Sequence, residues 1–117
     1  MQVPVEVYFH NTAKSDAVEA AVRERARKLE RYADEIISCR VTIEAPHKHQ
    51  HQGKLFRVTI DLHVPGEQIV VNRDPSEHHA HEDVAVAIRD AFDAARRRLQ
   101  DHTRVVRGKV KTHAEQP

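Results

Sequence analysis

The chain has 117 residues, 39% of them hydrophobic and 32% charged, so it can form one domain with a modest aliphatic core. Its 19 basic and 18 acidic residues nearly cancel, and its single cysteine excludes an intrachain disulfide. No apolar run reaches the roughly 20 residues of a membrane helix, and no signal peptide is recognisable. We therefore expect a cytoplasmic protein with no membrane partner.

The first predicted strand covers residues 3–9, where apolar and polar residues alternate as in a strand with one buried face. A helix from Asp16 to about Tyr32 follows, with apolar residues at helical spacing. Ser15 can cap this helix by accepting a backbone hydrogen bond, and Asp16 suits the positive end of the helix dipole.

Three more predicted strands show the same alternation. The second covers residues 37–43 and places Ile37 and Cys39 on its buried face, so we interpret Cys39 as a core residue rather than a nucleophile. The third covers residues 55–64, and after a tight Pro-Gly-Glu turn a short fourth strand covers residues 69–73.

The second predicted helix begins near Glu82 and carries an apolar stripe along its first half. Its second half and the residues after it are basic, with eight Lys or Arg and three acids between Val84 and His113. We expect one domain over residues 1–105 and a short, basic, flexible tail over residues 106–117.

The resulting order is β-α-β-β-β-α. Because a helix connects the first two strands, they should be parallel with a right-handed crossover, whereas the later, direct connections make antiparallel neighbours. The sequence therefore predicts an α+β fold. A four-stranded mixed sheet carries both helices on one face and exposes the other face to water.

Cationic side chains mark both predicted helices, and if the helices share one sheet face these side chains could flank a groove that binds phosphates. Few aromatic residues are predicted on the open sheet face, which favours structured RNA over a single-strand stacking platform. The alternative is a solvated helix surface with local pairs to neighbouring acids. The candidates are Arg23, Arg27, Lys28, Arg31, Arg89, Arg96, Arg97, Arg98, Arg104 and Arg107.

Histidines are concentrated in two predicted loops that the topology brings to one end of the sheet. These imidazoles could bind zinc or nickel, contact phosphates when protonated, or be solvated in mobile loops, and the sequence leaves the three open. We find no nucleophile arrangement or Gly-rich phosphate loop, and so expect no enzyme, no cofactor and no small-molecule substrate. The loop histidines are His47, His49, His51, His78, His79 and His81.

Particular segments, in this order, point to a known family. They are Ser15 before the first helix, residues 28–31 (Lys-Leu-Glu-Arg), residues 38–41 (Ser-Cys-Arg-Val) and residues 81–93. Together with the order of elements, they resemble the ribosome hibernation-promoting factor family, also called ribosome-associated inhibitor A. The resemblance spans about residues 2–105.

The resemblance implies a bacterial hibernation factor of stationary phase or stress. Such factors bind small-subunit ribosomal RNA in the channel for messenger and transfer RNA and block translation by steric occlusion. Their helix-borne cations contact the RNA. This chain departs from the family in having Ala85 where a Tyr is usual, and it resembles the short form, for which we expect a monomer. A general structured-RNA-binding domain, a metal-binding module built on the histidine loops, and a protein-interaction domain using the open sheet face are the alternatives.

Overall fold

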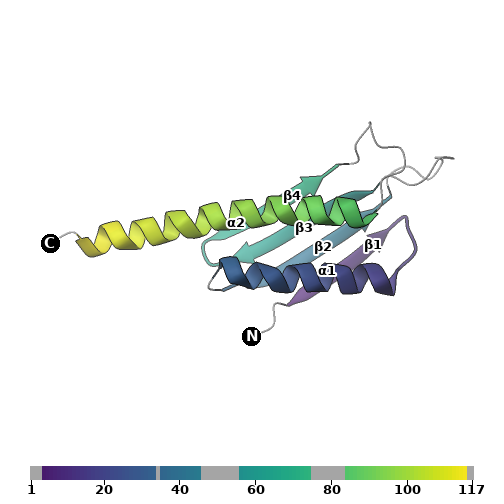
Figure 1. Ribbon diagram of the computed structural model, residues 1–117, viewed down its shortest axis with the longest axis horizontal. Helices are drawn as coiled ribbons and strands as arrows, with labels where there is room; N and C mark the ends of the chain where they lie inside the picture. The colour runs from purple at the N-terminus through teal and green to yellow at the C-terminus, as the bar shows by residue number, and fades with distance from the viewer. Residues whose placement is uncertain (1–3, 34, 46–55, 75–83, 116–117) are drawn as a thin grey trace.

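The computed structural model describes residues 4–33, 35–45, 56–74 and 84–115, with side chains in the last range as far as residue 108. Figure 1 shows two layers, a four-stranded sheet and two helices that lie across one of its faces. The C-terminal part of the second helix extends beyond the sheet (Figure 1). The predicted α+β fold is therefore confirmed.

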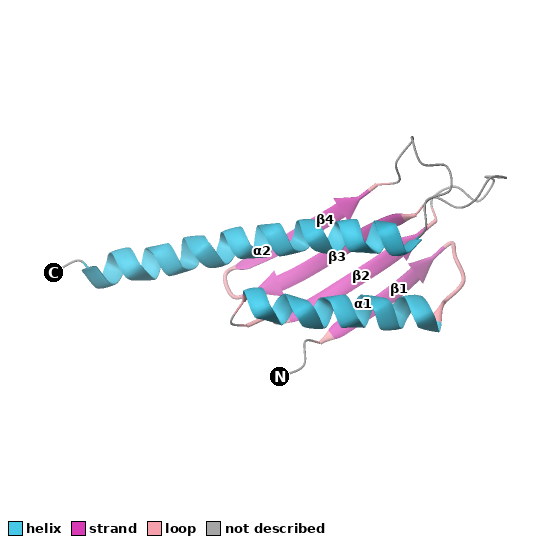
Figure 2. Cartoon of the chain, viewed as in Figure 1, coloured by secondary structure: helices cyan, strands magenta, loops and turns pink. Residues whose placement is uncertain are grey.

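The sheet contains β1 (Val5–His10), β2 (Ser38–Glu44), β3 (Arg57–Val64) and β4 (Glu67–Arg73), in that spatial order. As predicted, β1 and β2 are parallel, and β2–β3 and β3–β4 are antiparallel (Figure 2). Side chains alternate between the covered face and the open face along each strand. The sheet thus separates the molecule into a helical face and an open face.

Helix α1 covers Asp16–Lys28 and begins as predicted, because the Ser15 hydroxyl accepts a 3.2 Å hydrogen bond from the backbone N–H of Val18. The expected last turn of this helix is instead a 3-10 segment, η1, over Leu29–Tyr32. Tight turns of this kind are common at helix ends, where the last carbonyl groups lack partners.

Helix α2 covers Val84–Glu115 and packs on β3 and β4, whereas α1 packs on β1. The helix continues without a break through the domain boundary that we expected at residue 105. The flexibility of residues 106–117 stays a prediction.

The core lies between the helices and the sheet. Cys39 is 1% exposed, and this burial raises the pKa of its thiol to about 12, as suits a core residue. The placement of Ile37 on the buried face was wrong: it is 50% exposed, and Ile36 is buried instead. Regular alternation begins only at Ser38, where β2 starts, so the pattern does not extend back to Ile37.

Two connections use left-handed backbone conformations. Gly66, in the turn between β3 and β4, has φ 84°, which glycine adopts without strain. Asn11, directly after β1, has φ 58°, and asparagine is among the few side chains that tolerate this region. These two turns help to set where each strand ends.

Candidate nucleic-acid interface

The side of α2 that faces α1 is marked by one hydrogen bond. Thr103 Oγ1 donates a 2.8 Å hydrogen bond to the carbonyl oxygen of Tyr32 in η1. Residues three, four and seven positions apart share one side of a helix. Arg96, Gln100 and Arg107 therefore lie on the same side of α2 as Thr103, along the boundary between the helices.

A hollow of about 330 Å³ lies at this boundary, where η1 approaches α2. We call it the arginine hollow. Arg104 is 3.8 Å from Asp101, but both side chains are largely exposed, so this pair neutralises little charge. Arg31 and Arg104 therefore give the hollow a positive charge. Its lining residues are Arg31, Tyr32, Gln100, Thr103, Arg104 and Arg107.

Two of the predicted cations on α1 have local partners. Arg23 donates a 3.0 Å hydrogen bond to the carbonyl oxygen of Val5 in the edge strand β1 and lies 3.7 Å from Glu19. Arg27 contacts Glu24 at 2.6 Å, and this hydrogen bond lowers the pKa of Glu24 and raises that of Arg27. These two residues follow the alternative of a locally paired, solvated helix surface.

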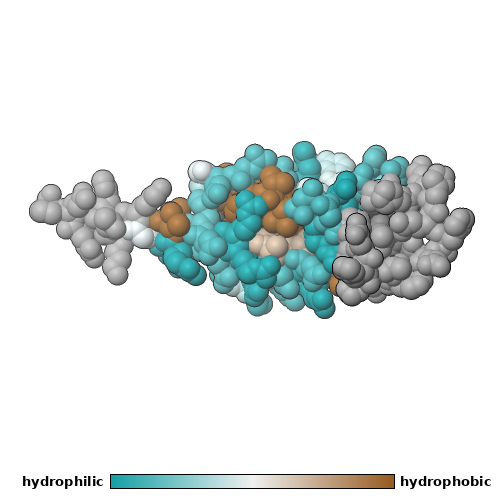
Figure 3. Space-filling view, turned by 90° about the horizontal axis from the view of Figure 1, so that it is seen from above, coloured by the Kyte–Doolittle hydropathy of each residue, from teal (hydrophilic) through white to brown (hydrophobic). Residues whose placement is uncertain are grey.

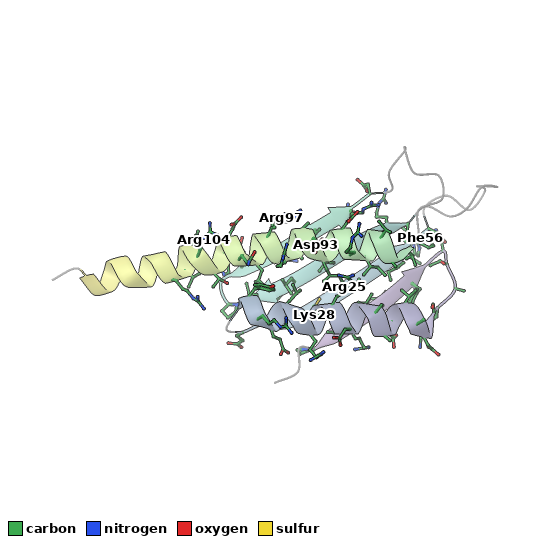
Figure 4. All side chains as sticks on the ribbon, viewed as in Figure 1. Arg25, Lys28, Phe56, Asp93, Arg97 and Arg104 are labelled. Atoms are coloured by element: carbon green, nitrogen blue, oxygen red, sulfur yellow. The ribbon has the colours of Figure 1, made fainter. Side chains whose placement is uncertain are left out.

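The side of α1 that faces α2 is cationic and less neutralised. Arg25 lies about 200° around the helix from Arg23, and therefore opposite the β1 edge (Figure 4). Among the described residues, Arg25, Lys28 and Arg31 have no ion pair or hydrogen bond partner. Sequence reasoning missed Arg25, and the available signal was its position three residues after Val22, which is buried.

The three consecutive arginines of α2 point in different directions. Arg96 lies on the side facing α1, and its Nε is buried without a hydrogen-bond partner among the described residues. Arg97 is exposed on the outer surface of the helix (Figure 4). Arg98 donates a hydrogen bond to the carbonyl oxygen of Val70 in the edge strand β4. The structure therefore does not bring these three side chains to one place.

Arg89 belongs to a small charged cluster that joins α2 to β4. It lies 3.2 Å from Asp90, which is also 3.1 Å from Arg73 at the end of β4. Burial alone would raise the pKa of Asp90, but hydrogen bonds from Arg73 and Arg89 outweigh it and lower the pKa. The charge of Arg89 is thus partly neutralised by Asp90.

On the open sheet face, one polar network joins β1 and β2. The Tyr8 hydroxyl donates a hydrogen bond to Glu6, which raises the pKa of Tyr8. Arg40 is 4.0 Å from Glu6, and its guanidinium group lies 5.6 Å from the centre of the Tyr8 ring. The polar groups of these three side chains therefore interact with one another.

Further along the open face, Arg57 lies between two acids, 3.3 Å from Glu44 and 2.8 Å from Asp74. Asp61 accepts a 2.8 Å hydrogen bond from Gln68 of the neighbouring strand. Both described arginines of this face, Arg40 and Arg57, therefore lie beside acids.

The possible metal site at the histidine loops stays a prediction, because all six loop histidines lie outside the described residues. Within the described ranges, no group of three or more His, Cys, Asp or Glu side chains could hold a metal ion. His10 is described, and its Nδ1 lies 3.1 Å from Glu44.

The β4 side of the molecule is mostly hydrophilic, with hydrophobic patches (Figure 3). Val70, Val105 and Val106 are among the exposed hydrophobic residues of β4 and α2. Scattered apolar side chains of this kind are normal on a protein surface. Within the described ranges, no helix combines the length and the apolar character needed to cross a bilayer.

Comparison with known proteins gives a family and a fold. A family model described as "Sigma 54 modulation protein / S30EA ribosomal protein" matches residues 5–107. The N-terminal domain of Protein Y from Thermus thermophilus has a similar structure, with a TM-score of 0.67 and 20% identity over 87% of this chain and 99% of that chain. A ribosomal subunit interface protein from Coxiella burnetii gives a TM-score of 0.64 and 16% identity over 86% and 97%. No curated protein matches the chain.

Proposed function

Because this chain belongs to the sigma 54 modulation protein / S30EA ribosomal protein family, we propose that it is a hibernation factor that inhibits translation. The family is ribosome-associated and not enzymatic. In this proposal one copy of the chain binds the small ribosomal subunit in the channel for messenger and transfer RNA. It blocks translation there by steric occlusion, in the cytoplasm of a stressed or resting cell.

One observation carries the proposal, the uneven neutralisation of charge on the two faces. Among the described residues, Lys28, Arg31 and Arg97 on the helical face form no ion pair or hydrogen bond, whereas Arg40 and Arg57 on the open face contact acids. A phosphate backbone gains most from cations that are not already neutralised. The helical face is therefore the surface that we expect to contact ribosomal RNA.

The shape of the helical face supports structured RNA as the partner. Two helices on a rigid sheet present cations along ridges with a concavity between them, which suits backbone contacts to folded RNA. Such contacts position a protein without reading the base sequence. In this mechanism, specificity for the channel comes from fitting its shape, and inhibition needs no chemical step.

The test is co-sedimentation of the full chain with small ribosomal subunits across a salt series. The double variant Lys28→Gln/Arg31→Gln removes two cations from the helical face, and Arg40→Gln/Arg57→Gln removes two from the open face. We expect the first variant to lower the log–log salt slope by about 1.4–1.8, since each phosphate contact contributes about 0.7–0.9. The second should leave the slope unchanged, and equal effects of the two variants would contradict the proposed surface.

Competition separates ribosome binding from general binding of structured RNA. A generic RNA duplex added in excess should displace little protein from small subunits if the channel shape contributes to recognition. Displacement at equal mass concentrations would instead favour a general structured-RNA-binding domain. A translation assay with matched protein concentrations then checks whether bound protein inhibits synthesis.

A further inference from the structure

A second hollow adjoins the arginine hollow and has a different chemical character. It measures about 200 Å³ and lies where α2 passes the end of the sheet, next to the turn between β3 and β4. We call it the apolar hollow. The two hollows share Thr103 and Arg107 as lining residues, so they lie side by side. The apolar hollow is lined by Ala33, Glu35, Val64, Pro65, His102, Thr103, Val106 and Arg107.

The two hollows match the two halves of a nucleotide. Arg31 and Arg104 offer planar guanidinium groups, which bind phosphate oxygens in a bidentate manner. Val64, Pro65 and Val106 offer apolar walls, against which the flat face of a base can pack. The arginine hollow alone falls at the lower end of the roughly 300–1,000 Å³ of small-ligand sites.

We propose that the two hollows together bind one nucleotide unit, with its phosphate in the arginine hollow and its base in the apolar hollow. The unit is either an unstacked nucleotide of an RNA chain or a free nucleotide, because both carry the same phosphate and base. Where RNA supplies it, this inference rests on the proposed function and adds an unpaired nucleotide to the expected backbone contacts.

The orientation follows from the charges around the two hollows. Arg107 lines both hollows and so does not choose between them, but Glu35 lines only the apolar hollow, and its carboxylate repels a phosphate there. Arg31 and Arg104 attract the phosphate to the other hollow, where Gln100 can also donate a hydrogen bond from its amide group. A reversed ligand would place the phosphate beside Glu35 and leave these donors unused.

The walls of the two hollows are held in place by contacts across the elements that form them. The Thr103–Tyr32 hydrogen bond, 2.8 Å long, fixes η1 against α2. His102 Nδ1 lies 2.5 Å from Glu67, which begins β4. Leu99, one turn earlier on α2, is fully buried. A site that is already formed loses less conformational freedom when it binds a ligand.

The test is an NMR titration of the isotope-labelled full chain with guanosine monophosphate, ribose 5-phosphate, inorganic phosphate and a single-stranded RNA tetramer. The first variant is Val106→Glu, which places a carboxylate in the apolar hollow. Its control is Val105→Glu, an equal charge change at the next residue, which lines neither hollow. Both valines are exposed, so both variants should fold.

We expect guanosine monophosphate to bind at least about tenfold more tightly than ribose 5-phosphate, since only the former carries a base. Val106→Glu should weaken nucleotide binding about tenfold, and Val105→Glu by less than about twofold. Arg31→Gln should weaken the binding of all phosphate-bearing ligands, whereas Arg40→Gln on the open face should not, because Arg40 lines neither hollow. These pairs separate the base and phosphate ends of the site.

Equal affinity for guanosine monophosphate and ribose 5-phosphate, or equal effects of the two valine variants, would overturn the proposal. So would the absence of nucleotide binding, and if the chain still co-sediments with small subunits, the proposed function survives that result. Tighter binding of the tetramer than of the mononucleotide supports the site with RNA as its source. Tighter binding of the mononucleotide supports it with a free nucleotide as its source.

Discussion

On the helical face, cations such as Lys28, Arg31 and Arg97 form no ion pair or hydrogen bond among the described residues, whereas on the open sheet face acids and arginines lie at contact distance. The whole chain has a formal net charge of only +1. The difference between the faces shows that the net charge of the whole chain does not indicate where a polyanion would bind. The useful quantity is how much of each cation's charge is already neutralised by a neighbour.

The geometry of the two layers explains the difference. In the sheet, side chains on neighbouring strands lie about 5 Å apart, so opposite charges placed across strands meet. On the helices, most acids that pair with arginines are sequence neighbours, as in Glu24 with Arg27, and Asp90, which also contacts Arg73 of β4, is an exception. Where a helix cation forms no ion pair, as with Arg31 although Glu30 precedes it in η1, its guanidinium group stays available.

The largest expected effect comes from removing the packing that holds the helical face on the sheet. Leu99 is fully buried under α2, so Leu99→Ala should lower the free energy of unfolding by roughly 2–5 kcal/mol. Urea denaturation followed by circular dichroism measures this loss. Val105→Ala on the same helix is the control, because Val105 is exposed and should change stability by less than about 0.5 kcal/mol. Equal losses would mean that Leu99 does not anchor the helix.

The fold was predictable because its signals are periodic. Alternation in the strands, helical spacing in α1 and the Ser15 cap all appear in the sequence and in the structure. The prediction was wrong where the sequence pattern does not mark the end of a strand. Ile37 continues the alternation of β2 backwards, but the strand itself starts at Ser38, and only tertiary packing selects Ile36 for the core.

The candidate site was less predictable than the fold, because the sequence shows which residues are cationic but not which way their side chains point. Arg96, Arg97 and Arg98 are adjacent in sequence, but the 100° between successive helix positions sends them to three places. Arg31 and Arg107 are far apart in sequence, yet both line the arginine hollow. The hollow depends on the packing of η1 against α2, which no local pattern reveals.

Adding a positive charge to each face in turn tests whether only the helical face contacts RNA. Asp93 lies on the helical face of α2, three residues before Arg96 (Figure 4). Asp93→Lys should make the log–log salt slope of small-subunit binding steeper by about 0.7–0.9, as expected for one added phosphate contact. Asp61→Lys, the same change on the open face, should leave the slope unchanged. A steeper slope for Asp61→Lys would show that the open face also contacts RNA.

Two neighbouring arginines test whether the direction of a side chain decides if it contacts RNA. Arg97 points outward, so Arg97→Gln should lower the salt slope by about 0.7–0.9 and leave stability unchanged. Arg98 donates to the carbonyl oxygen of Val70, so Arg98→Gln should lower stability by about 0.5–1.5 kcal/mol with a smaller change in slope. Salt-series binding and urea denaturation of both variants measure the two quantities. The reverse pattern would make Arg98 the RNA contact.

The smallest expected effect concerns Asp90, an acid of the helical side that contacts Arg73 and Arg89. Its burial would raise its pKa, but the two arginines lower it below the ordinary value of 3.8. The stabilisation is therefore present above about pH 4 and is lost as the pH falls through the folded-state pKa. The carboxylate is 38% exposed, so solvent screening limits its contribution, and Asp90→Asn should cost about 0.5–1 kcal/mol at pH 7.

Urea denaturation of Asp90→Asn and of the unaltered protein at several pH values checks this expectation. The stability difference between the two should be constant from pH 7 to about pH 5 and shrink below about pH 4, because protonated Asp90 no longer attracts the arginines. Glu24→Gln on α1 is the control, since its local pair with Arg27 does not join separate elements. A difference that persists unchanged at pH 3 would mean that Asp90 joins α2 to β4 by shape and hydrogen bonding alone. In that case its charge has no part in setting how α2, and with it the cationic helical face, sits on the sheet.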